Sequence, residues 1–338
     1  MKNKLCKCNS RRKIFSRGNT LTEFIYKKFG KHLFKLVLVL TIFYMFIFLC
    51  AEVTAVSLLV NYISGTQLWV TSALVIITTL IYTLYGGLRV SILTDNLQFF
   101  IVLVLLFILV HFLFNFNQNH ISFEDIQNNS AHLLSAKYVP NYTAGLTFFI
   151  AVAATNLFHQ GNWQRVFAAK NNKVLKKSLL FAFVIIIPIV FFMGISGIFA
   201  ISIDSKVNPD LAFFSILLKD ETEFLSIIII ILAISLTIST LDTLVNAISS
   251  IVIVDGEKIY LKSNQKNYLR LSKFFVVFLS IISFIIASKG FSVLYLFLLA
   301  DLLCCSAVFV IFYGFYQKNF NEKKAIISIL FGLFLGLL

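Results

Sequence analysis

The stretch FLSIIIIILAISLTISTLDTLVNAISSIVIVD occupies residues 224–255. It is long and apolar enough to cross a membrane, because a spanning helix needs about 20 mostly apolar residues. Its second half nevertheless carries hydroxyl, amide and carboxylate side chains. On a helix, five of them fall within a sector of about 80°: Ser235, Ser239, Asp242, Asn246 and Ser249. The stretch therefore predicts a membrane helix with one polar stripe.

The whole chain has the composition of a membrane protein. Hydrophobic residues make up 59% of its 338 residues and charged residues only 13%, where soluble domains have about 25% charged residues. We predict an all-α polytopic membrane protein. Residues 1–31 form a basic cytoplasmic N-terminal segment without the apolar core of a signal peptide, and residues 32–338 form a transmembrane domain. Its about nine helices are expected at 32–63, 67–86, 92–116, 143–164, 176–203, 224–254, 271–288, 290–316 and 325 onward, the last one cut short.

The positive charge follows the predicted topology. If the N-terminal segment is cytoplasmic and the sides alternate, 25 of the 29 Lys and Arg residues lie in or beside cytoplasmic segments. This agrees with the positive-inside rule. The net charge of +14 therefore indicates topology in a lipid bilayer rather than nucleic-acid binding. We expect a multi-pass protein of the cell membrane, whether plasma membrane or inner membrane.

The sequence offers little for an enzyme or for a cofactor. Cys6 and Cys8 have the wrong spacing for a zinc site and lack a partner pair. No group of His, Cys and acidic residues recurs on one helix face. We therefore predict a protein that is not an enzyme, has no cofactor and has no transition-metal site.

The polar stripe has two interpretations. Hydroxyl and small residues can hold neighbouring helices together. A carboxylate such as Asp242 is costly within a membrane unless it is paired or faces water, and a carboxylate among hydroxyls offers the hard oxygen ligands that suit a small cation.

Two further polar clusters accompany the stripe. In YTLYGGLRVSILTDNLQ (82–98), Gly86 and Gly87 are expected to break the helix, Thr94 to cap a new one and Asp95 to lie in its first turn. In ATNLFHQGNWQRVFAAKNNK (154–173), polar residues share one face of a single predicted helix: Thr155, Asn156 and His159. An ordinary interfacial histidine remains an equal interpretation of the last.

These residues carry a resemblance to the sodium/solute symporter family. The segment YTLYGGLRVSILTDNLQ resembles its first signature and ISTLDTLVNAISSIVIVD (238–255) its second. The segments TLTEFIYKKFG (20–30, with Thr22 where Pro is usual) and NWQRVFAAKN (162–171) are also similar to family motifs. The four motifs occur in the family's order.

The resemblance implies a LeuT-type bundle of two inverted five-helix repeats with broken helices at mid-membrane. On that plan the chain holds core helices 3 to 10 and the start of one more helix, so that the bundle is incomplete and core helices 1 and 2 are absent. A non-transporting partial product, or a membrane sensor or scaffold with the same fold, is the alternative function.

The resemblance also implies sites. The family's sodium site falls on the Ser239 and Thr240 hydroxyls and the Leu236 carbonyl, Asp95 matches a second cation position, and Asp242 could tune either. The expected activity is sodium-coupled symport of a small polar organic solute, with protons as the alternative coupling ion.

The same resemblance places the solute in a cavity lined by Thr155, Asn156, His159 and Asp301. Val184 stands where sugar-transporting members have Lys, which argues against a sugar. An amino acid, urea, a carboxylate or an amine remains open.

Overall fold

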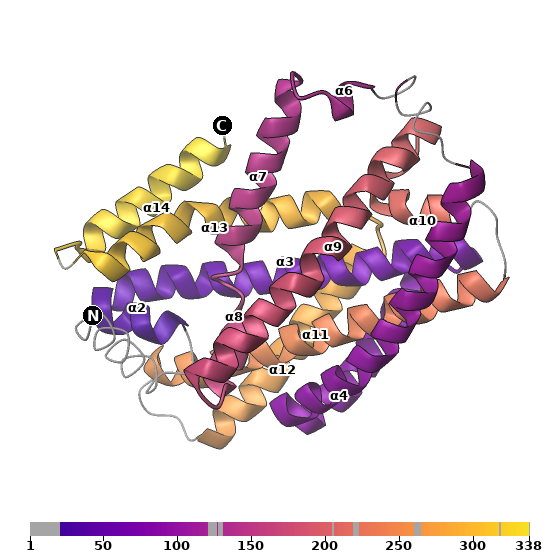
Figure 1. Cartoon of the computed structure of the whole chain (residues 1–338). Coiled ribbons are helices and arrows are strands. Elements are labelled where there is room, and N and C mark those ends of the chain that lie inside the picture. The colour runs from indigo at the N-terminus through magenta and orange to yellow at the C-terminus, as the bar shows by residue number, and fades with distance from the viewer. Residues whose placement is uncertain are drawn as a thin grey trace.

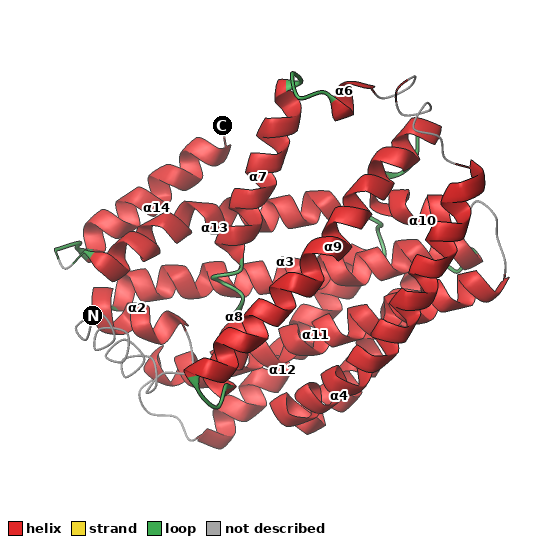
Figure 2. Cartoon of the chain, in the orientation of Figure 1, coloured by secondary structure: helices red, strands yellow, loops and turns green. Residues whose placement is uncertain are grey.

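The computed structural model describes residues 21–120, 127, 131–204, 206–218, 223–259, 265–317 and 319–337. Within these residues every regular element is a helix, as Figure 2 shows. The elements are α2 (Leu21–Phe29), α3 (Lys31–Ser64), α4 (Leu68–His120), α6 (Ala131–Leu134), α7 (Val139–Thr155), α8 (Gln160–Ala168), α9 (Asn172–Ile203), η1 (Pro209–Leu211), α10 (Ala212–Leu217), α11 (Glu223–Ile259), α12 (Gln265–Ala287), α13 (Val293–Tyr316) and α14 (Glu322–Leu337). The all-helical prediction is confirmed for this part of the chain.

Six helical segments in the described residues are long and apolar enough to cross a membrane: Lys31–Ser64, Leu68–Tyr85, Asn172–Ile203, Glu223–Gly256, Asn267–Ala287 and Val293–Gly314. Two shorter apolar segments, Ser91–Val104 and Val139–Thr155, accompany them. All eight overlap predicted helices. Six candidate spans are nevertheless fewer than the nine helices expected from the sequence.

Helix α3 lies at the centre of the bundle (Figure 1). It packs against α13, α11, α12 and α4, and most of its length is buried. Small polar side chains form its contacts with two neighbours: Cys50 Sγ lies 3.2 Å from Ser283 Oγ of α12, and Ser57 Oγ lies 2.9 Å from Ser72 Oγ of α4. A helix that is apolar on nearly every face is stable only when neighbours surround it, and α3 meets that condition.

Helix α4 contains both of the helices predicted at 67–86 and 92–116. The predicted break at Gly86 and Gly87 is wrong as stated, because helical backbone continues through it. The path is nevertheless sharply bent. Tyr82 and Thr94 contact the same carboxylate, whereas 12 residues of straight helix would separate them by about 18 Å. Thr94 lies inside α4 and donates to the Ser91 carbonyl at 2.9 Å instead of capping a new helix.

The helix predicted at 143–164 is broken in two. Helix α7 ends at Thr155 and α8 begins at Gln160. Turn-type bonds with a spacing of three residues, such as Phe158 N to Thr155 O at 2.8 Å, replace the helical ladder between them. His159 then caps α8, because its Nδ1 accepts from the Asn162 backbone N–H at 3.3 Å. The break puts backbone groups and polar side chains in the middle of an apolar run.

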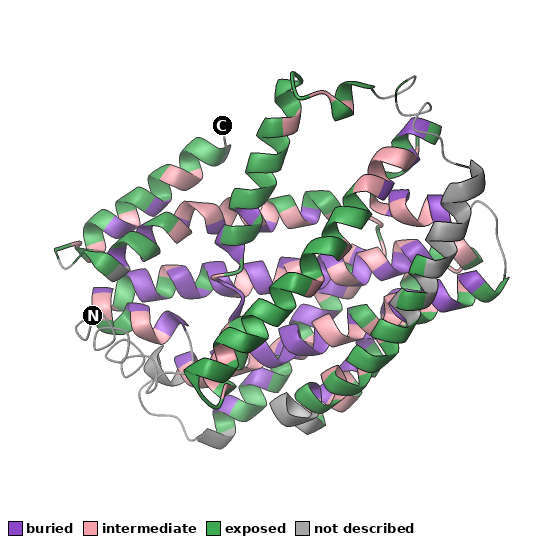
Figure 3. Cartoon of the chain, in the orientation of Figure 1, coloured by how far each residue is buried: buried purple, intermediate pink, exposed green. Residues whose placement is uncertain are grey.

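Helix α9 crosses the outside of the bundle, and Figure 3 shows it almost wholly exposed. None of its most apolar 18-residue window is buried. Large side chains such as Phe181, Val190 and Phe191 are each more than 60% exposed. Such a surface is suited to lipid rather than to water.

Two segments outside the predicted membrane helices contain helices. The N-terminal segment 1–31 includes α2, whose Leu21, Ile25 and Phe29 are buried in the main core. The segment between the predicted helices 176–203 and 224–254 includes η1 and α10. In that segment the Asp210 carboxylate accepts from the Val293 N–H at 3.0 Å and the Leu294 N–H at 3.3 Å, and so caps α13.

Candidate functional site

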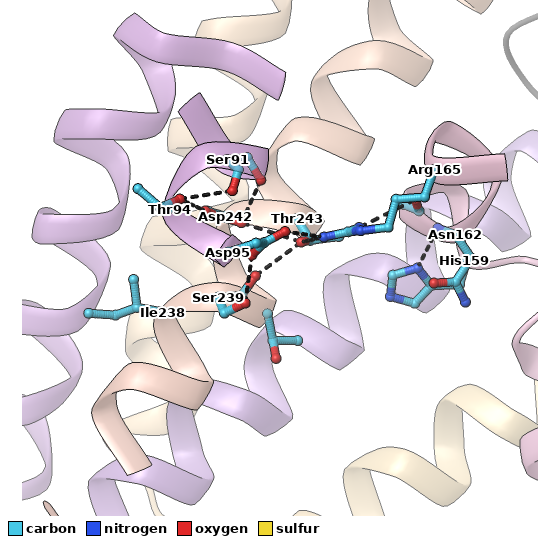
Figure 4. Close-up of polar contacts among 12 residues, drawn as sticks. Ser91, Thr94, Asp95, His159, Asn162, Arg165, Ile238, Ser239, Asp242 and Thr243 are labelled. Atoms are coloured by element: carbon cyan, nitrogen blue, oxygen red, sulfur yellow. Dashed lines mark hydrogen bonds and ion pairs between the residues drawn. The ribbon is translucent and has the colours of Figure 1, made fainter. Parts of the chain in front are cut away.

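The Asp242 carboxylate is the centre of a buried hydroxyl cluster. It is fully buried on α11 and accepts hydrogen bonds from three hydroxyls of α4: Ser91 at 2.8 Å, Tyr82 at 3.1 Å and Thr94 at 3.2 Å. The Thr243 hydroxyl lies 3.3 Å from its Oδ1. Figure 4 shows Ser91 and Thr94 pointing at the carboxylate. Both oxygens are thus engaged by protein donors, as a buried carboxylate requires.

A second acidic residue, Asp95 of α4, contacts two further helices, α11 and α8 (Figure 4). Its Oδ1 accepts from Ser239 of α11 at 2.7 Å and its Oδ2 from Arg165 of α8 at 2.6 Å. Arg165 also donates to the Thr243 hydroxyl at 2.8 Å. The guanidinium therefore bridges α4 and α11, and its planar set of donors suits such a double contact.

The four motifs singled out in the sequence meet in this network. The Thr22 hydroxyl, in the segment 20–30, donates to the Asp255 carboxylate at the end of the segment 238–255, at 2.5 Å. The Gln164 side-chain amide, in the segment 162–171, donates to the Ser250 hydroxyl of the segment 238–255 at 2.7 Å. Together with the Asp95 and Asp242 contacts, these bonds tie α2, α4, α8 and α11 together. The polar stripe of α11 thus faces other helices instead of lipid, and helix-to-helix contact is one of its functions.

The residues predicted to bind the cation divide into two groups. Leu236, Ser239 and Thr240 lie close together, and the Thr240 hydroxyl donates to the Leu236 carbonyl at 3.1 Å. This face of α11 is partly open, with Leu236 44% exposed. Asp95 reaches it through Ser239. Asp242 faces α4 instead, with its oxygens occupied.

The open face offers neutral oxygens with a carboxylate nearby, a set that fits a small monovalent cation. The described part of the chain contains no group of three or more His, Cys, Asp or Glu residues that could hold a metal ion.

The predicted substrate residues gather around the break between α7 and α8. Thr155 and His159 are buried, whereas Asn156 is exposed and accepts from the Asn162 side chain at 3.0 Å. The His159 ring packs edge-on against Tyr44 at 6.1 Å and Phe48 at 5.7 Å. Asp301 of α13 lies close to the Thr155 hydroxyl. The structure therefore brings the four residues to one region.

One acidic residue of this region was missed in the sequence. Glu52 lies in the middle of α3 within CAEVTAV (50–56), two turns beyond Tyr44. No described residue donates a hydrogen bond to its carboxylate or forms an ion pair with it. The signal that could have found it is simple: a lone carboxylate in a membrane span is expensive and marks a functional site by default.

A cavity of about 630 Å³ lies beside the polar network, between α4, α8, α11 and α12. Three polar atoms of its lining residues are buried without a partner in the described part of the chain: Thr83 Oγ1, Gln164 Oε1 and Asn246 Nδ2. Lys273 lies at its edge, with its Nζ 5.7 Å from the centre of the Tyr85 ring. Unsatisfied polar groups next to a cavity of this size are typical of a space that holds water or a polar molecule.

Comparison with known proteins decides the family. The family model described as "Sodium:solute symporter family" matches residues 12–332, almost the whole chain. The chain belongs to this family. This is a family of multi-pass membrane transporters rather than of enzymes, and membership implies the LeuT-type fold that the motifs suggested.

A more specific likeness is to the spermidine transporter DUR31 of Candida albicans. The two are 26% identical over 328 residues, which is 94% of this chain and 61% of that protein. The symporter-family chain thus spans less than two thirds of the length of this relative.

Proposed function

We propose that this member of the sodium:solute symporter family carries a small organic cation of the polyamine class across the cell membrane, coupled to sodium. The observation that carries the proposal is a pair of acidic residues: Asp301, close to Thr155 at the broken helix, and Glu52, one turn of α3 from Phe48, whose ring packs on His159. A membrane-embedded carboxylate without a partner favours a cationic ligand. The name of the fungal relative agrees with that charge.

The sodium part of the proposal is supported by the open face of α11. Leu236, Ser239 and Thr240 present a carbonyl and two hydroxyls within about one helical turn. Neutral oxygens bind a monovalent ion moderately, and a transporter has to release its ion. Asp95 accepts from Ser239, so it lies near enough to strengthen such a site electrostatically. We propose Asp95 as part of this site and Asp242 as a structural residue.

The test is uptake of radiolabelled spermidine by the purified protein in proteoliposomes. We expect uptake to rise when sodium is higher outside than inside. A parallel experiment with a pH gradient and no sodium separates proton coupling from sodium coupling. Equal uptake under all gradients, or none of any polyamine, would exclude coupled polyamine transport.

Two matched variants test the cation residues. Ser239→Ala combined with Thr240→Ala removes two oxygen ligands, so the sodium concentration for half-maximal uptake should rise about tenfold or more, which corresponds to about 1.4 kcal/mol. Ser249→Ala is the control, because this hydroxyl lies 3.3 Å from the Ser272 hydroxyl at the other end of the stripe. Equal shifts for both variants would mean that the hydroxyls only hold helices together.

A further inference from the structure

Helices α3 and α13 run antiparallel, which fixes the relative level of their residues. At one end, the Glu322 side chain that follows α13 accepts from the His32 and Leu33 N–H groups at the start of α3, at 2.8 and 3.0 Å. In the middle, the Phe48 and Phe297 rings pack edge-on at 4.9 Å. Phe297 and Asp301 are one turn apart, so Asp301 lies near the level of Tyr44.

The two carboxylates therefore lie on opposite sides of the aromatic pair. Asp301 is one turn from Phe297 in the direction of Tyr44, and Glu52 is one turn from Phe48 in the other direction. Tyr44, Phe48 and Glu52 are spaced by four residues and share one face of α3 within about 80°. From the Tyr44 level to Glu52, α3 advances eight residues, or about 12 Å.

The chemistry between the carboxylates is apolar and aromatic. Phe48 and Phe297 are both only partly buried, and the His159 ring of the break packs on Phe48 at 5.7 Å. Aromatic faces attract ammonium groups and also pack against methylene chains. Along α3, one carboxylate is thus followed by a pair of aromatic rings and then by a second carboxylate.

We infer that a linear polyamine lies along α3 with one terminal ammonium group at Glu52 and the other at Asp301, its chain packed across Phe48 and Phe297. The inference rests on the proposed function and adds a length requirement to it. Spermidine has nine covalent bonds between its terminal nitrogens. An extended chain advances about 3.6 Å per three bonds, so these nitrogens are separated by about 11 Å, close to the offset of about 12 Å between the two residues along the axis of α3.

The experiment is competition with radiolabelled spermidine for binding to the purified protein in nanodiscs. Three competitors separate charge from length. The compound 1,8-diaminooctane has the same nine bonds between two ammonium groups, octylamine has the same chain with one ammonium group, and putrescine has two ammonium groups only five bonds apart. Binding is measured without a gradient, so it does not depend on transport.

In the unmodified protein, 1,8-diaminooctane should compete at least about tenfold better than octylamine and putrescine, as expected when a second charge-assisted contact of about 1.4 kcal/mol is made. In Glu52→Gln and in Asp301→Asn, the advantage over octylamine should fall to less than about twofold, while octylamine itself changes little. Glu223→Gln, at the start of α11, is the matched control and should keep the full advantage.

The outcomes distinguish this inference from the proposed function. If spermidine binds and is taken up but the length preference is absent or unchanged in Glu52→Gln and Asp301→Asn, the two-carboxylate site is wrong and polyamine transport stands. If spermidine does not bind at all, both fail. Glu52→Asp keeps the charge and the fold, and it should retain at least half of the length preference. Loss of binding in Glu52→Asp together with unaltered binding in Glu52→Gln would contradict a role for charge.

Discussion

The carboxylates of the membrane helices differ in how many hydrogen-bond partners they have. In the network of α4, α8 and α11, Asp242 accepts from four hydroxyls and Asp95 from Ser239 and Arg165. Beside the break between α7 and α8, Glu52 has no partner within the described residues, and Asp301 has the Thr155 hydroxyl nearby. Both pairs carry the same chemical group within a helical bundle of similar apolarity.

The difference separates structure from ligand binding. Asp242, whose oxygens are all engaged by hydroxyls, has repaid its desolvation within the protein and has little left to offer a ligand. A carboxylate without donors still carries that cost, and a cation that reaches it relieves the cost. The family motifs lie in the first region. The sequence features that are easiest to recognise therefore identify residues that hold the helices together more than residues of the proposed solute site.

The largest effect should come from removing the best-satisfied carboxylate. Asp242→Ala leaves the hydroxyls of Tyr82, Ser91 and Thr94 without their acceptor and opens a cavity. We expect a loss of about 3–5 kcal/mol in stability, measured as the fraction of folded protein in detergent during denaturant titration. Asp242→Asn keeps one acceptor oxygen and should lose less. A stable Asp242→Ala protein would show that the cluster is not structural.

A smaller effect is expected from the bridging guanidinium. Arg165→Ala removes the contacts to Asp95 and Thr243, and the partly exposed position limits the loss to about 1–3 kcal/mol. Arg165→Lys keeps the charge but cannot make both contacts at once. The stability of this variant should therefore lie between that of the unmodified protein and that of Arg165→Ala. A double-mutant cycle with Asp95→Asn measures the pair itself. A coupling free energy near zero would contradict the bridge.

The smallest effect on stability should come from Glu52. Because no described residue depends on its carboxylate, Glu52→Gln should leave the stability within about 1 kcal/mol of the original, or raise it by relieving the cost of a lone charge. The same variant should lose the length preference for diamines. A large loss of stability would place Glu52 with Asp242, and the contrast between the two regions would disappear.

Part of this arrangement could be predicted from the sequence. The long apolar runs predicted α3, α9, α11 and α13 within a few residues, because one span of apolar side chains has few alternatives in lipid. The acidic and hydroxyl residues of the motifs form polar contacts between helices, one of the two interpretations of the stripe, whereas their binding of a cation stays a prediction. Asp242, however, was expected beside Ser239 at the cation, and it faces α4.

Three features could not be predicted from periodicity alone. The break after Thr155 has no proline to indicate it, and polar side chains bond locally there: Asn162 contacts both Asn156 and His159. The helical backbone continues through Gly86 and Gly87 despite the low helix propensity of Gly. Glu52 is a lone carboxylate in an apolar run, so periodicity does not reveal it, although the cost of such a group within a membrane could have done so.

The break between α7 and α8 has a mechanical consequence. Helix α7 packs on α13, whereas α8 packs on α11 and is held there through Arg165. Residues 156–159 are the joint between two anchored bodies. Rotation of one body against the other requires changes in the backbone angles of residues 157–159, whose N–H groups form turn-type bonds instead of helical ones, so such a rotation costs few hydrogen bonds. The polar residues of this hinge would therefore change their spacing whenever the two bodies move.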